Sequence, residues 1–81
     1  MKITVSVAPF LLQYIPKYVT PNSGGEWHVD EGTTVAEIVA MLHFSEGADV
    51  LTIVNDVYCL DQSRQLKEGD SVLLAPLIAG G

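Results

Sequence analysis

The sequence predicts an α+β domain, with one main helix packed on one face of a mixed sheet of four to five strands. Residues 3–7 alternate apolar and polar, a single helical stripe follows at 34–42, and two runs rich in strand-forming residues, 50–54 and 71–75, come after it. The order strand, strand, helix, strands is typical of a sheet covered on one side. We expect one domain over residues 1–81.

The N-terminal part contains two expected strands. Ile3 to Val7 has the two-residue period of a half-buried strand, and Glu26 to Asp30 is a second short run expected to pair with it as a hairpin. Prolines at positions 9, 16 and 21 interrupt the chain between them, so this stretch predicts turns and loops, with a helical turn or two at Phe10 to Ile15.

The helix has a clear start. Thr34 and Glu37 have the spacing of a capping box, in which each side chain satisfies a free backbone N–H at the helix N-terminus. The apolar residues that follow recur at helical spacing and form one stripe, Val35, Ile38, Val39 and Leu42. We expect the helix to close over Phe44 to Gly47.

The C-terminal half predicts three strands. Val50 to Val54 is strongly β-branched, and Asn55-Asp56 is suited to a tight hairpin turn into Val57 to Leu60. Lys67 to Asp70 predicts a second turn, and Ser71 to Ala75 the last strand.

The charge excludes several classes of partner. Ten acidic residues against four basic ones give a formal net charge of −6. Binding to nucleic acid or to an anionic membrane requires clustered Lys and Arg, so neither is expected. The single cysteine, Cys59, permits no internal disulfide, and from the first residues we expect no signal peptide. We therefore expect a cytoplasmic protein.

Few side chains suggest chemistry of their own. Cys59 lies among acidic neighbours and is expected to be structural rather than a reactive thiol. His28 and His43 match no metal-ligand spacing with it, so no metal site is expected. Trp27 is interpreted as a sheet residue that covers the core. The apolar segment from Phe10 to Tyr18 is either core or interface, and the sequence leaves both open.

Several segments, considered together, point to a known family. They are Leu12-Gln13-Tyr14-Ile15-Pro16, Glu31-Gly32-Thr33-Thr34-Val35, Val54-Asn55-Asp56, Leu66-Lys67-Glu68-Gly69-Asp70 and Pro76-Leu77-Ile78-Ala79-Gly80-Gly81. In order and spacing they resemble motifs of the MoaD and ThiS sulfur carriers, relatives of ubiquitin. In that family the hairpin usually has Val-Asn-Gly, so Asp56 departs from it.

The resemblance implies a ubiquitin-like β-grasp fold in which residues 77–81 form a flexible C-terminal tail. It also implies that an E1-like enzyme of the MoeB or ThiF type uses ATP to adenylate the carboxylate of Gly81, which then becomes a thiocarboxylate. Ile78, Ala79 and Gly80 would thread into that enzyme. The carrier would bind no cofactor and would not itself be an enzyme.

The physical chemistry of the terminus agrees with this role. A C-terminal carboxylate, with a pKa of about 3.3–3.7, is ionised at neutral pH and must be activated before it can accept sulfur. Glycines without side chains suit a thin tail that enters a narrow channel. Ordering the tail costs about 1–2 kcal/mol per residue, so contacts from the folded domain must offset it. We expect them near the last strand, at Leu77, Pro76, Leu74 and Phe10.

Several functions share this tail. The preferred hypothesis is a MoaD-like small subunit of molybdopterin synthase that docks on a MoaE-like large subunit. A ThiS-like carrier would instead deliver sulfur to thiazole synthase for thiamine. A ubiquitin-like modifier would be joined through Gly81 to lysines, and an interaction module would not need Gly80 and Gly81.

Overall fold

The computed structural model describes residues 1–16 and 25–77. Its elements, in chain order, are β1 (Lys2–Val7), a 3-10 helix η1 (Pro9–Tyr14), β2 (Gly25–His28), α1 (Val35–Met41), β3 (Val50–Val54), β4 (Val57–Tyr58) and β5 (Ser71–Pro76). The described part therefore has the predicted α+β organisation, with α1 as the main helix.

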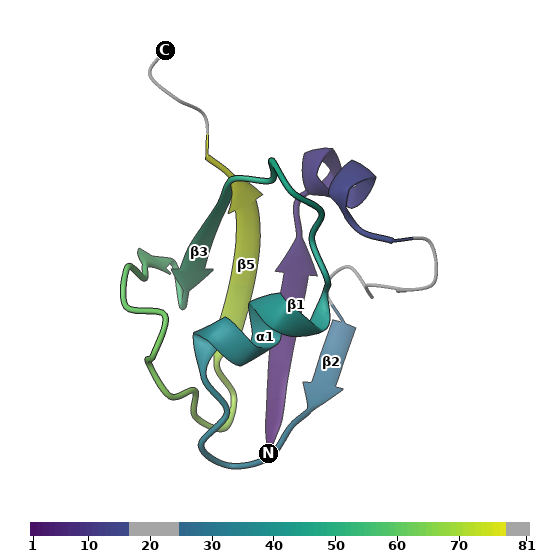
Figure 1. Ribbon diagram of the computed structural model, residues 1–81. Helices are drawn as coiled ribbons and strands as arrows, with labels where there is room; N and C mark the ends of the chain where they lie inside the picture. Colours follow the sequence, from purple (N-terminus) through teal and green to yellow (C-terminus); the bar gives the residue numbers. More distant parts are fainter. Residues whose placement is uncertain (17–24, 78–81) are drawn as a thin grey trace.

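The five strands form one mixed sheet in the order β2-β1-β5-β3-β4. The two central strands, β1 and β5, run parallel, and every other neighbouring pair is antiparallel. The first and last strands of the domain thus lie side by side, and α1 crosses one face of the sheet (Figure 1). This is the ubiquitin-like β-grasp arrangement expected from the sequence resemblance.

The core lies between α1 and the sheet. Alternate residues of β1, β3 and β5 face inward. Val35 and Ile38 of α1 and its C-cap residue Leu42 are fully buried, while Val39 is only partly buried. The inward-facing strand residues are Ile3, Val5, Val7, Thr52, Val54, Val72 and Leu74. Burial of each apolar side chain in this set stabilises the fold by about 1.5–3 kcal/mol.

The predicted capping box is present at the start of α1. The Glu37 N–H donates to Thr34 Oγ1 at 3.3 Å, and the Thr34 N–H donates to Glu37 Oε1 at 3.2 Å. The helix ends earlier than the sequence predicted, because His43 adopts a φ of 53° directly after the C-cap Leu42. A left-handed residue at this position stops a helix, so residues 44–47 form the following turns instead.

Two other segments differ from the prediction in extent. The strand expected at Val57 to Leu60 pairs with β3 only at Val57 and Tyr58. Beyond them the Cys59 N–H still donates to the Thr52 carbonyl at 2.9 Å, and Cys59 is buried whereas Leu60 is exposed. The turns expected at Phe10 to Ile15 form η1, and only Leu11 of that helix is buried. Within the described residues, no helix is long and apolar enough to cross a membrane.

Candidate functional site

The last two described residues, Pro76 and Leu77, each contact the sheet through the backbone. Pro76 lies opposite Val50 at the end of the β3–β5 ladder, and the Leu77 N–H donates to the Asp49 carbonyl at 3.0 Å. This bond is the last anchor of the described chain before residues 78–81. The predicted tail residues Ile78, Ala79, Gly80 and Gly81 lie outside the described residues.

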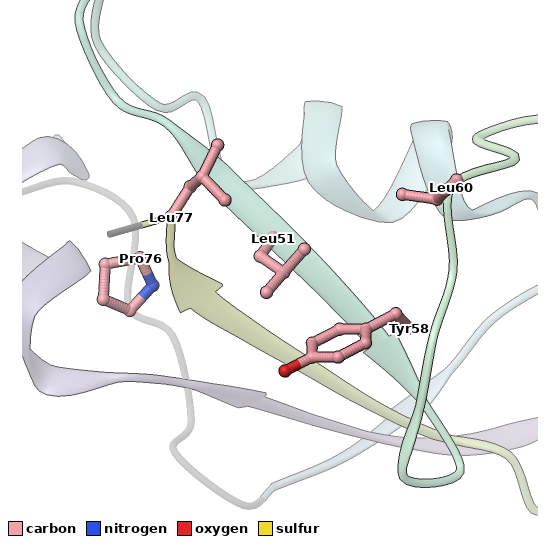
Figure 2. Close-up of a pocket in the computed structure, with 5 residues that line it drawn as sticks. All are labelled: Leu51, Tyr58, Leu60, Pro76 and Leu77. Carbon is pink, nitrogen blue, oxygen red and sulfur yellow. The ribbon is translucent and has the colours of Figure 1, made fainter. Parts of the chain in front are cut away.

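An apolar hollow lies where β5 ends. It is lined by Leu51, Tyr58, Leu60, Pro76 and Leu77, none of which is charged. Figure 2 shows Leu51 beside Tyr58 on β3 and β4, with Pro76 and Leu77 at one end and Leu60 reaching in from the segment after β4. Because Thr52 and Val54 face the core, their neighbour Leu51 faces away from α1, so the hollow lies on the open face of the sheet.

Three of the side chains that line this hollow are unusually exposed for large apolar or aromatic residues. Leu60 is 87% exposed, Tyr58 68% and Leu77 54%. Ile53 and Leu73, which are opposite each other in the β3–β5 ladder, extend the apolar surface along the open face. A contiguous apolar surface of this kind usually marks an interaction site. We call the five residues that line the hollow the tail-base patch.

Leu74 does not belong to this surface, which corrects the sequence-based assignment. Its side chain is 0% exposed and packs in the core, so it is not accessible to a partner in the folded domain. The segment Ser71 to Pro76 is apolar on both faces, and its pattern alone could not show which side faces inward. The parallel pairing with β1 decides it, because Val7 and Leu74 are opposite each other on the buried face. Leu73 is the outward-facing neighbour.

The segment around Phe10 divides between core and surface. Leu11 is fully buried, whereas Phe10 is 59% exposed and its ring lies 6.2 Å from that of Tyr14. The segment therefore serves partly as core and partly as exposed surface, and its last residues, including Tyr18, lie outside the described residues. The η1 helix lies at the same end of the sheet as the end of β5 (Figure 1), where Ala8 N–H donates to the Leu74 carbonyl at 2.8 Å.

Other candidate groups do not line the tail-base patch. The Cys59 thiol is buried and lies 3.3 Å from the Asp61 carbonyl, to which it donates. Hydrogen bonds from the Ser63 hydroxyl and from its backbone N–H lower the pKa of the Asp61 carboxyl. Among residues 1–16 and 25–77, no three His, Cys, Asp or Glu side chains gather where they could hold a metal ion.

Comparison with known proteins gives the family. Residues 17–81 match the ThiS family, which is most of the chain and includes both terminal glycines. The chain belongs to the ThiS family. Carriers of this kind are generally non-catalytic and work with E1-like enzymes. The tail-base patch therefore lies at the root of the segment that ends in the two glycines of a ThiS-family chain.

A solved structure supports the fold independently. The crystal structure of SAMP1 from Haloferax volcanii superposes with a TM-score of 0.65, covering 100% of both chains at 13% sequence identity. At that identity the likeness concerns the fold, and it agrees with the β-grasp topology described above. A search of curated proteins gave no match.

Sequence reasoning predicted only part of the tail-base patch. It assigned Pro76 and Leu77 but not Leu51, Tyr58 or Leu60. The alternation in Val50 to Val54 could have indicated that Leu51 and Ile53 share one face. Tyr58 and Leu60, two residues apart in the expected strand, could likewise have been assigned to one face. That this face meets Pro76 and Leu77 depends on strand pairing, which no local pattern gives.

Proposed function

We propose that this ThiS-family protein carries sulfur as a thiocarboxylate on Gly81. In the first step, a carboxylate oxygen of Gly81 attacks the α-phosphorus of ATP on an E1-like enzyme, and pyrophosphate leaves. In the second, a hydrosulfide attacks the acyl carbon and displaces AMP, which leaves the thiocarboxylate. The carrier supplies the reacting carboxylate, and the enzyme supplies the catalytic groups.

One observation carries the proposal. The family match continues through Gly81, and the last backbone anchor among the described residues, the bond from Leu77 to Asp49, lies directly beside the tail-base patch. A partner that binds the patch would hold the base of the tail while the four residues beyond Leu77 enter its active site. Four extended residues reach about 13–14 Å, enough to enter a channel.

Burial of the patch against a partner can also offset the free-energy cost of ordering the tail. Ordering the four tail residues costs about 4–8 kcal/mol at 1–2 kcal/mol per residue. Burying exposed side chains such as Leu60, Tyr58 and Leu77 against a partner contributes about 1.5–3 kcal/mol each when burial is complete. The two quantities are similar, so docking through the patch can offset the ordering of the tail.

For the sulfur acceptor, we propose a synthase of the MoaE type, with this chain as the small subunit, as in MoaD-like carriers. A thiazole synthase is the second candidate, favoured by the family description that matches the chain. Both acceptors require the same Gly81 thiocarboxylate and differ only in the enzyme that receives the sulfur.

Intact-mass spectrometry tests the proposal directly. The chain is incubated with the E1-like enzyme of its own organism, ATP and sodium sulfide. We expect a mass gain that corresponds to replacement of one oxygen by sulfur. The chain without Gly81 is the control, and it should gain nothing.

Two other outcomes have distinct meanings. If an enzyme with proven activity on another carrier leaves the mass unchanged, the proposal is wrong for that pairing. If the chain instead appears joined by an isopeptide bond to lysines of other proteins and forms no thiocarboxylate, the modifier function replaces it. Once the thiocarboxylate forms, addition of each purified synthase with its acceptor shows which one consumes it.

A further inference from the structure

A second surface lies at the opposite edge of the sheet. The strand β2 is an edge strand, and its only partner among the described residues is β1. Beside it lies a groove between β2 and α1, which we call the β2–α1 groove, lined by Trp27, His28, Val29, Asp30, Thr33, Glu37 and Met41. The sheet order puts β1, β5 and β3 between β2 and β4, so this groove is separate from the tail-base patch.

The hydrogen-bonding pattern shows which backbone groups of β2 point away from β1 and have no partner among the described residues. Val29 and Met1 exchange two bonds, from the Val29 N–H to the Met1 carbonyl at 2.9 Å and from the Met1 amine to the Val29 carbonyl at 2.6 Å. In an antiparallel ladder such pairs alternate with pairs that exchange none. In the β1–β2 register, Ile3 pairs with Trp27, so Glu26 and His28 direct their N–H and C=O groups away from β1.

The groove beside this edge is lined by both apolar and acidic side chains. Trp27 is half-buried and Met41 is 45% exposed, and they provide an aromatic ring and a flexible apolar side chain. The charged lining residues are Asp30 and Glu37, and both are exposed. No Lys or Arg of the described residues lines the groove. The one nearby cation in the described part of the chain, Lys2, lies 3.8 Å from Glu26, with which it pairs.

From this arrangement we infer that the β2–α1 groove binds an extended peptide that is apolar at its centre and flanked by Lys or Arg. The peptide adds a strand to the outer edge of β2 through Glu26 and His28, the usual mode of strand addition to an exposed sheet edge. Its apolar side chains lie against Trp27 and Met41. A flanking cation lies near Asp30 and Glu37 and can also stack on the Trp27 ring.

The position of Trp27 makes the test sensitive, because it is the single tryptophan of the chain. The full chain is titrated with the blocked peptide Lys-Val-Ile-Val-Arg and followed by Trp fluorescence and by amide chemical shifts. We expect saturable changes in the Trp27 signal and in the Glu26 and His28 amides. The matched peptide Glu-Val-Ile-Val-Glu should bind at least tenfold more weakly.

A double variant and a matched control test the role of the acidic residues of the groove. Glu37→Gln keeps the capping box, since glutamine serves at this position, and combined with Asp30→Asn it removes two charges from the groove. We expect this double variant to bind the basic peptide about two- to tenfold more weakly. The control, Glu46→Gln with Asp49→Asn, makes the same charge change at exposed residues that do not line the groove and should bind like the unmodified chain.

The strand addition has its own test. One form of the basic peptide is N-methylated at both of its valines and another at its central isoleucine, so the two forms lose donors on opposite edges. One of the two should bind more than tenfold more weakly than the other. The inference would be overturned if the two methylated peptides bound with equal affinity. It would also be overturned if Glu26 and His28 showed no shifts up to millimolar peptide, or if the shifts were confined to Tyr58 and Leu73. Because Gly81 has no part in it, deletion of Gly80 and Gly81 should leave peptide binding unchanged.

Discussion

The Asn55 side chain donates to the Asp70 carboxylate at 2.9 Å and thereby joins two turns that are 15 residues apart. The same carboxylate accepts from the Lys67 N–H at 2.8 Å, and Asn55 Oδ1 accepts from the Ser71 N–H at 2.9 Å. The β3–β4 hairpin turn and the turn before β5 are therefore held to each other at one end of the sheet.

The first prediction concerns this link. Replacement of Asp70, which is 8% exposed, by Ala leaves the Lys67 N–H and the Asn55 amide without their acceptor. We expect the free energy of unfolding to fall by about 1–3 kcal/mol. Urea denaturation measures it.

A double-mutant cycle isolates the bond itself. Asn55→Gly removes the side chain and tolerates the φ of 51° at this position. The cycle with Asp70→Ala should give a coupling energy of about 0.5–3 kcal/mol. Full additivity of the two changes would show that the bond contributes nothing.

The second prediction concerns the hairpin residue Asp56, whose φ is 67°. Glycine adopts this left-handed conformation without a steric cost, whereas other L-residues do so at a penalty. We expect Asp56→Gly to raise the free energy of unfolding by about 0.5–1 kcal/mol, and Asp56→Ala to lower it. Both are measured by urea denaturation, and a lower stability of the glycine variant would contradict the account.

The third prediction concerns Thr52, whose buried hydroxyl has no hydrogen-bond partner among the described residues. Valine has nearly the same shape without the polar atom, and leaving a polar group unpaired in the core is costly. We expect Thr52→Val to raise the free energy of unfolding by about 1 kcal/mol, as measured by thermal and urea denaturation.

Thr33 provides the matched control for that substitution. It is also buried, but its hydroxyl donates to the Asp30 carbonyl at 2.6 Å. Thr33→Val should therefore lower stability. If both valine variants changed stability in the same direction, the hydroxyl of Thr52 would not be the cause.

The fourth prediction tests the tail-base patch and rests on the proposed carrier function. Leu60→Gln changes a residue that is 87% exposed, so stability should stay within about 0.5 kcal/mol. Loss of this apolar contact with the activating enzyme should lower kcat/KM for adenylation by about tenfold or more. Leu12→Gln, the same substitution at an exposed residue of η1 that lines neither the patch nor the β2–α1 groove, is the control and should leave adenylation unchanged. Equal effects of the two substitutions would show that the patch is not the docking surface.

Local sequence signals correctly predicted the start of α1 and the β3–β4 turn, because each depends on residues that are neighbours in the chain. The Thr34 and Glu37 capping box forms as expected because both partners lie within one helical turn. The Asn55-Asp56 turn forms because both residues tolerate positive φ. The end of α1 was predicted wrongly, because His43, and not a glycine, takes the left-handed conformation that stops the helix. A histidine carries no strong signal for that conformation.

The sequence by itself determined the class of fold, the start of the helix, the central strands and the resemblance that the family match bears out. Each depends on residue periodicity or on short motifs, which are properties of neighbouring positions. Only the tertiary structure decided that Leu74 is core and Leu73 surface, and that Leu51, Tyr58 and Leu60 meet Pro76 and Leu77. The reason is that strand pairing sets which face of an apolar segment is buried, and pairing joins residues far apart in the chain.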